Sequence, residues 1–314
     1  MSRRFVSVAF YALFVVFVAW YLARLDFNTL DDLHPRYGFL AVATVVGLLY
    51  RYWGVFVWLA ILKGLGAAIP AGRSGFAAVY AKAWLGRYLP GKVTWILGKI
   101  YFASAKGIPR RKLGAAAVLE GGLQTGVSLL LALLLLTLDA RLDVISPSMR
   151  MLLLLTGGAI FVTLLPPVFN RFLAVIYSRL KKQALPIDDK VDAKTLTSGG
   201  VLYAVGFLLT GISYLLFTMA FIPELTTDDY LFVVGTFNLA GAIGIIALFA
   251  PSGLGVREGV QLLLLPVVMP AELALVVTMA ARLWSVAVDV VFFAIANGFH
   301  TWRSRAAAAR ILRS

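Results

Sequence analysis

The chain contains no cysteine, and this absence excludes disulfide bonds, thiol catalysis and thiolate metal sites. It also lacks a G-x-x-x-x-G-K-[ST] loop, so nucleotide hydrolysis of the P-loop type is excluded. No nucleotide-sugar motif or carboxylate cluster for a metal is present in the sequence. We therefore expect no metal site and no cofactor.

Charged residues are scarce as well, at 14% of 314 residues, whereas soluble domains have about 25%. Hydrophobic residues make up 61% of the chain, the mean hydropathy is +0.89, and several apolar runs are long enough to cross a bilayer. No polar block is long enough to fold separately. The sequence thus predicts an all-α, polytopic helical membrane protein with a single domain over residues 1–314 and about six to eight spans.

The charges that are present are mostly basic, with 29 Lys and Arg against 15 Asp and Glu and a net charge of +14. In a soluble protein this excess would suggest nucleic acid, but here the cations cluster in short loops, as they do at the cytoplasmic ends of spanning helices. We expect no nucleic-acid partner, a multi-pass location in the cell inner (plasma) membrane, and both termini in the cytoplasm. His34 and His300 then lie on opposite sides, which argues against a histidine-based site.

Apolar runs separated by alternating basic and acidic loops mark the expected spans. A long polar loop, Asn170–Ser198, and a basic tail after Gly298 are expected in the cytoplasm. The spans expected from these runs are Phe5–Ala23 (a retained signal anchor), Tyr37–Leu62, Leu113–Leu138, Met151–Phe169, Gly199–Ile222, Tyr230–Ala250 and Ala271–Gly298.

The segment Trp84–Lys99, WLGRYLPGKVTWILGK, interrupts this pattern. Pro90 removes a backbone donor and Gly91 adds backbone freedom, so a helix cannot run cleanly through the pair. Basic loops flank Gly75–Ser104 on both sides, and the chain must therefore enter and leave on one side of the membrane. We expect two half-helices hinged at Pro90-Gly91, lining a polar site because freed backbone groups are tolerated only against protein or water.

Two cations next to this break are candidate anion ligands. A half-helix that opens at Lys92 would present unpaired N–H groups and a positive dipole end, and with Arg87 nearby it would suit a phosphate or carboxylate. The alternative is that these cations, with Lys99, only reach the cytoplasmic interface.

A second break, PSGLGVREG at Pro251–Gly259, has the same features. We expect an irregular loop followed by a helix that resumes near Val256 and places Arg257 and Glu258 at its start. The alternative is a tight turn with a local surface ion pair between these two residues. The residues that form the break are Pro251, Gly253 and Gly255.

The two breaks fall at corresponding positions when the chain is halved at about residue 157, a pattern that is typical of inverted-repeat transporters.

Other charged residues lie inside apolar helices. Glu120 must find a cation or take up a proton, and Arg87, Lys92 and Arg282 are the cations considered. Arg282 and Asp289 share one face of the last span, where Arg282 is the site candidate and Asp289 a neutralising partner. Arg51, central in the second span, is left without an assigned role.

The motifs GRYLPGK and PSGLGVREG, with Glu120 and Arg282, resemble the lysylphosphatidylglycerol synthase transmembrane-region family. The resemblance implies a flippase-like lipid-translocating module. In the bifunctional synthases of this family that module moves aminoacylated phosphatidylglycerol after a soluble domain attaches the amino acid. This chain looks like the translocating half alone, so aminoacyl transfer is not expected.

We therefore expect translocation of an anionic phospholipid or polyprenyl-phosphate-linked lipid across the inner membrane. Arg87, Lys92, Arg257 and Arg282 would bind the headgroup, while Glu120 and Glu258 would balance charge or couple to protons. One alternative is a membrane-embedded lipid-modifying transferase with Glu120 or Glu258 as its base. Another is a non-catalytic partner of an envelope glycolipid or aminoacyl-lipid enzyme. A separate lipid-modifying enzyme and a second copy of the chain are the protein partners considered.

Overall fold

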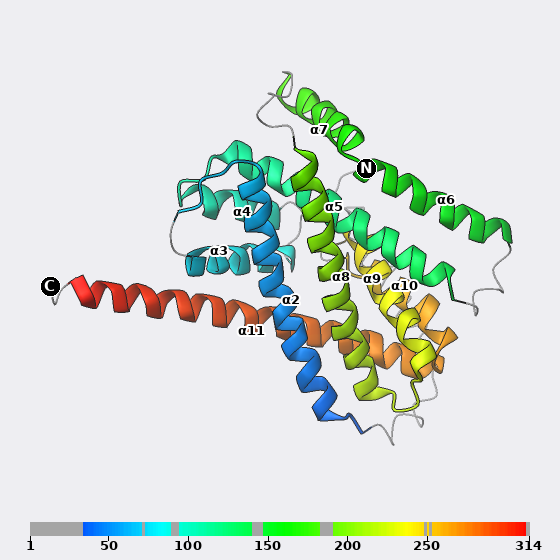
Figure 1. The fold of residues 1–314 in the computed structure, drawn as a ribbon. Helices are drawn as coiled ribbons and strands as arrows, with labels where there is room; N and C mark the ends of the chain where they lie inside the picture. The colour runs from blue at the N-terminus through cyan, green and yellow to red at the C-terminus, as the bar shows by residue number, and fades with distance from the viewer. Residues whose placement is uncertain are drawn as a thin grey trace, which may run out of the picture.

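The structure, a computed structural model, describes residues 34–70, 73–88, 94–139, 147–182, 191–247, 250 and 253–311. Within these residues every regular element is a helix and none is a strand (Figure 1). The all-α fold class is confirmed. The expected first span, Phe5–Ala23, lies outside the described residues.

Five helices of the described part are long and apolar enough to cross a membrane. A helix of 28 residues, the length of the first, is about 42 Å long at 1.5 Å per residue, which exceeds the roughly 30 Å of a bilayer core. The five helices are α2 (Tyr37–Gly64), α5 (Arg110–Thr137), α8 (Ala193–Phe221), α9 (Tyr230–Ile246, preceded by the 3-10 turn η5, Thr227–Asp229) and α11 (Ala271–Ile311).

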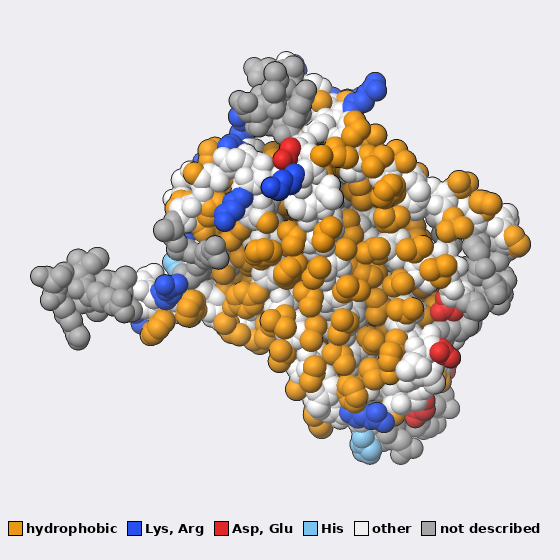
Figure 2. Space-filling view, in the orientation of Figure 1, with side chains coloured by type: hydrophobic (Ala, Val, Ile, Leu, Met, Phe, Trp, Pro, Cys, Tyr) orange, Lys and Arg blue, Asp and Glu red, His pale blue; other side chains and the backbone are white. Residues whose placement is uncertain are grey.

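The outer surface agrees with a membrane location. Large apolar side chains such as Leu49, Leu208 and Leu283 are exposed on three of these helices. Figure 2 shows a broad apolar surface, with Lys and Arg mostly toward the upper left of the view and Asp and Glu mostly at the lower right. An apolar surface of this extent is costly in water and suits contact with lipid. The protein is thus a multi-pass membrane protein.

The chain bends sharply between α6 (Pro147–Leu164) and α7 (Pro166–Lys181), by 76°. Leu165 has extended backbone angles because it precedes the Pro166-Pro167 pair, which disfavours helical angles at the preceding residue. The predicted span Met151–Phe169 therefore contains a bend at Leu165.

The predicted polar loop Asn170–Ser198 is also wrong in part, because much of it is helical. α7 occupies its beginning, and α8 begins at Ala193 rather than at Gly199. This earlier start follows from Asp192, whose Oδ1 accepts a hydrogen bond from the backbone N–H of Thr195 at 2.9 Å and caps the helix.

Two short helices flank the first break, as the sequence predicted. α3 (Arg73–Leu85), extended by the 3-10 turn η2 (Gly86–Tyr88), packs against α4 (Thr94–Ser104), and α3 also packs along α11. The break residues Pro90 and Gly91, and Lys92 beside them, lie outside the described residues.

The second break also agrees with its prediction where it is described. α10 (Val256–Leu264) begins at Val256, continues into the 3-10 turn η7 (Leu265–Val267), and packs on α9. Gly253 and Gly255 have φ values of +69° and +81°, in the left-handed region that glycine adopts readily. Pro251 lies outside the described residues, and the inverted repeat stays a prediction.

The last helix is longer than expected. α11 continues beyond Gly298 to Ile311, so the predicted basic tail is helical and projects from the body of the molecule (Figure 1). Ala and Arg make up seven of the thirteen residues of this extension, 299–311, which contains no glycine or proline, and this explains why the helix does not stop.

Candidate functional site

A cavity of about 230 Å³ lies among the helices, lined by side chains of both large hydrophobic clusters. Trp84 and Tyr203 belong to one cluster, and Tyr214 and Phe237 to the other. Most of the lining is apolar or aromatic. The elements that contribute to it are α2, α3, η2, α4, α5, α8, α9, α10 and α11.

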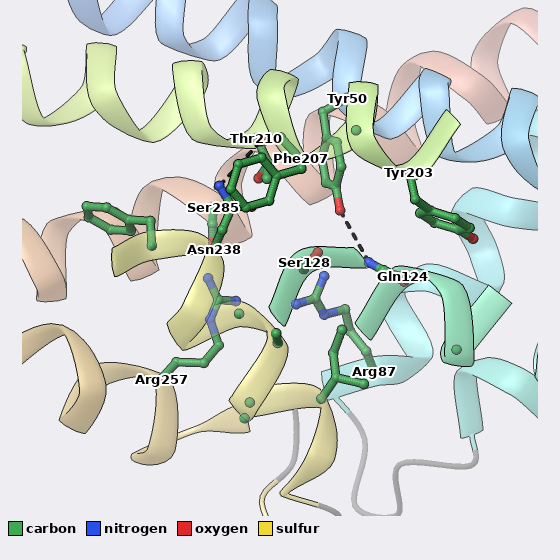
Figure 3. Close-up of a pocket in the computed structure, with 18 of the residues that line it drawn as sticks. Tyr50, Arg87, Gln124, Ser128, Tyr203, Phe207, Thr210, Asn238, Arg257 and Ser285 are labelled. Carbon is green, nitrogen blue, oxygen red and sulfur yellow. Dashed lines mark hydrogen bonds between the residues drawn. The ribbon is translucent and has the colours of Figure 1, made fainter. Parts of the chain in front are cut away.

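Three arginines line this cavity, Arg51 from α2, Arg87 from η2 and Arg257 from α10, and no acidic side chain is among the described residues that line it. Figure 3 shows the guanidinium groups of Arg87 and Arg257 directed into the same space. Arg87 and Arg257, which lie beside the two breaks and 170 residues apart in the sequence (257 − 87), thus line one cavity.

The stem of Arg257 passes between two glycines. A Cβ atom at Gly244 would lie 2.9 Å from Cδ of Arg257 and closer still to Cγ, and a Cβ at Gly253 would lie 3.0 Å from Cγ. Either contact is too tight for a side chain. The lack of a Cβ atom at Gly244 and at Gly253 therefore leaves room for the side chain of Arg257.

The guanidinium group of Arg257 is only partly satisfied. Its Nη2 donates to the hydroxyl of Tyr214 at 3.1 Å, while its buried Nε has no hydrogen-bond partner. No carboxylate of the described residues lies within ion-pair distance of it. A buried donor without an acceptor is costly, and an anion in the cavity would offset that cost.

Asp289 on α11 connects the other two arginines. Its Oδ1 accepts from Nε of Arg51 at 2.8 Å, and its Oδ2 accepts from the Tyr88 hydroxyl at 2.6 Å and lies 3.8 Å from Nη1 of Arg87. Arg51 is 6% exposed and Asp289 1%. Asp289 therefore neutralises the buried Arg51, in the role of neutralising partner that the sequence suggested, and it connects η2 and α2 to α11. Arg87 also stacks on Trp84, with Cζ 4.6 Å from the ring centre.

Glu120 has a different partner from those considered. Its Oε2 accepts from Nζ of Lys99 at 2.7 Å, and both side chains are buried. The ammonium group also lies 4.3 Å from the ring centre of Trp95 and 4.7 Å from that of Tyr80. Arg87 and Arg282, two of the cations proposed for Glu120, are bound elsewhere. Neither Lys99 nor Glu120 lines the cavity.

Glu258 and Arg282 form a further ion pair, and neither side chain lines the cavity. Oε1 of Glu258 lies 3.6 Å from Nη1 of Arg282, and Oε2 accepts from the backbone N–H of Gly255 at 2.6 Å. Glu258 thus caps the first turn of α10. The alternative of a surface pair between Arg257 and Glu258 is not supported, because Glu258 is buried and bonded to other groups. Arg282 is not part of the cavity lining.

Sequence reasoning missed several polar residues of the site. Arg51, Tyr214 and Asn238 all line the cavity. Asn238 donates from Nδ2 to the carbonyl of Val234 at 2.9 Å and to that of Phe207 at 3.3 Å. Their signal was present, because a cation or an amide inside an apolar span usually faces a polar cavity or a partner. Within the described part of the chain, no three His, Asp or Glu residues lie close enough to bind a metal ion.

The chain matches a known protein family. The family model described as "Lysylphosphatidylglycerol synthase TM region" matches residues 4–292, which include both break segments and every charged residue of the cavity. No curated protein matches the chain.

Proposed function

Because the chain belongs to the lysylphosphatidylglycerol synthase TM region family, we propose that it translocates an anionic lipid across the membrane, with the headgroup held in the arginine-lined cavity. Membership of the family gives the protein a membrane-lipid role. The observation that carries the step to translocation is the meeting of Arg87 and Arg257, from two separate breaks, at one cavity inside a membrane-spanning bundle.

The chemistry of this cavity suits a phosphate. Guanidinium groups bind phosphate oxygens through paired N–H donors, and such charge-assisted bonds are about twice as strong as neutral ones. Charged groups inside a membrane are costly unless they pair with a counter-ion, and a bound headgroup would supply the charge that Arg257 lacks. The aromatic and aliphatic remainder of the lining would tolerate the first carbons of a lipid tail.

Only the headgroup would need this polar path, because the acyl or prenyl tails can remain in the bilayer. The lipid is an anionic phospholipid or a polyprenyl-phosphate-linked lipid in this proposal. The protein would lie in the inner membrane with its termini in the cytoplasm, beside a separate enzyme that modifies the lipid. Lys92, in the first break, would add a further cation.

A transferase is less well supported. A general base must reach its substrate with a free lone pair, whereas Glu120 is bonded to Lys99, and Glu258 to Arg282 and a backbone N–H. Neither carboxylate lines the cavity.

The test is translocation in proteoliposomes. Phosphatidylglycerol labelled with NBD on its acyl chain is incorporated, and dithionite reduces only the dye in the outer leaflet. We expect the wild-type protein to make nearly all dye reducible, and Arg87→Ala and Arg257→Ala to leave the inner half protected. Arg303→Ala, at an exposed position on the projecting end of α11, is the matched control. Unchanged translocation in both cavity variants, each folded by size-exclusion chromatography, rejects the proposal.

A further inference from the structure

The cavity carries more positive charge than one phosphodiester can match. Its charged lining consists of Arg51, Arg87 and Arg257, which together carry three positive charges because guanidinium stays protonated. Asp289, in contact with Arg51 and near Arg87, returns one negative charge. The described residues thus leave an excess of two positive charges (3 − 1) around the cavity.

The neighbouring ion pairs do not change this count. Glu258 pairs with Arg282, and Glu120 pairs with Lys99, so each pair is neutral by itself. None of these four residues lines the cavity. The remaining polar groups of the lining, such as Asn238, Ser285 and Thr210, are uncharged (Figure 3).

We infer that the preferred headgroup carries two negative charges, as a phosphomonoester or a diphosphate does, rather than the single charge of a phosphodiester. This inference rests on the proposed function, since it names the substrate class of the same cavity. Arg257 is the residue that discriminates, because its buried Nε has no acceptor and no carboxylate of the described residues lies within ion-pair distance of its guanidinium group. Arg51 and Arg87 already have Asp289 near them.

The geometry gives the second charge a place to bind. A phosphomonoester has three terminal oxygens that can accept hydrogen bonds, whereas a phosphodiester has two, because its third oxygen carries a second substituent. Arg87 and Arg257 point into the cavity from different elements, η2 and α10 (Figure 3). One phosphate bound between them would therefore need separate oxygens to accept hydrogen bonds from each guanidinium group. The same excess of positive charge disfavours a headgroup with a net positive charge.

The test is binding by isothermal titration calorimetry to the purified full chain in neutral detergent at pH 8. The probes are dihexanoyl phosphatidic acid, whose phosphomonoester is a dianion at this pH because its second pKa is near 6, and dihexanoyl phosphatidylglycerol, a monoanion. We expect wild-type protein to bind phosphatidic acid about tenfold more tightly, as one further charge-assisted bond provides. Arg257→Gln removes one charge and should bring the two affinities close to equal.

Two variants keep this result interpretable. Arg257→Lys retains the charge and should retain the preference, even if it weakens both affinities. Arg303→Gln makes the same change at an exposed position and should leave both affinities unchanged. Equal affinities in the wild type, or a tenfold preference that persists in folded Arg257→Gln, overturn the inference. If labelled lipids then still cross the bilayer in a manner that depends on Arg87 and Arg257, the proposed function stands without it. Absence of both binding and translocation overturns both.

Discussion

Arg51 and Asp289 are 238 residues apart in the sequence and form a buried ion pair, with 2.8 Å between Nε and Oδ1. The pair connects α2 to α11 at the wall of the cavity, and the Tyr88 hydroxyl donates to the other oxygen of Asp289. A charge pair this deeply buried stabilises a structure little relative to apolar packing, but breaking it leaves one charge without compensation.

Replacement of Asp289 should therefore be more harmful than replacement of the whole pair. We expect Asp289→Leu to lower the free energy of unfolding by about 3–5 kcal/mol, because Arg51 then stays buried without its carboxylate. The double variant Arg51→Met/Asp289→Leu should recover at least about 1 kcal/mol of that loss. Unfolding by SDS in mixed micelles measures both quantities. Additive losses would show that the two residues are not energetically coupled.

Gly244→Ala should impair translocation without any change in charge. The new Cβ would collide with the stem of Arg257, so the guanidinium group must leave its position in the cavity, and the strain should destabilise the protein by about 1–3 kcal/mol. The proteoliposome assay measures the loss. Gly259→Ala, on the helix that carries Arg257, is the control, since a Cβ there meets nothing within 4 Å. Equal activity of the two variants would contradict the steric argument.

Lys99 and Glu120 should behave as a structural pair rather than as part of the transport path. Lys99→Met leaves a buried carboxylate without its cation and should cost about 3–5 kcal/mol of stability. Adding Glu120→Gln removes the orphaned charge, so the double variant should regain most of the thermal midpoint in detergent and should translocate lipid at nearly the wild-type rate. Loss of translocation in a stable double variant would instead point to a proton-coupled role for Glu120.

The cap at Asp192 should make the stability of α8 depend on pH. Hydrogen bonds from the side chain and the backbone N–H of Thr195 hold the pKa of Asp192 below its ordinary value. The carboxylate therefore contributes its stabilisation at pH values above about 4, the unfolded pKa of Asp, and loses it as the pH falls through the lower folded value. Asp192→Ala should cost about 1 kcal/mol at pH 7.

The measurement for this cap is hydrogen exchange at the backbone N–H of Thr195, which the wild-type protein should protect at pH 7 and Asp192→Ala should not. Asp192→Asn, a neutral cap of similar strength, should keep the protection with no dependence on acid. Protection of Thr195 in the alanine variant would show that another acceptor holds this N–H.

Much of the architecture could be predicted from the sequence, because long apolar runs and Pro-Gly breaks act locally. The start of α10 at Val256 and the two half-helices around the first break followed from glycine and proline alone. The bend at Leu165 could not be predicted, because a proline pair near the end of an apolar run is compatible both with the end of a span and with a bend followed by another helix. The helical extension after Gly298 is not evident from the sequence, because closely spaced cations also predict a polar tail.

The pairing of charges was harder to predict, since it depends on which helices lie side by side. The partner of Glu120, Lys99, was not among the cations considered, because the closeness of these two residues follows from how α4 packs on α5. Arg51 could not be assigned for the same reason, as its partner is on α11. Local patterns identify which charged residues need a partner. Only the tertiary packing identifies which residue that partner is.

The two glycines on either side of the Arg257 stem also bear on redesign. The passage they leave fits an unbranched side chain, so lysine, glutamine or methionine can follow the same route into the cavity, whereas a β-branched residue would meet the backbone of Gly244 or Gly253. One position can thus be varied to alter the charge and length of a side chain that lines the cavity, while the surrounding backbone stays as it is.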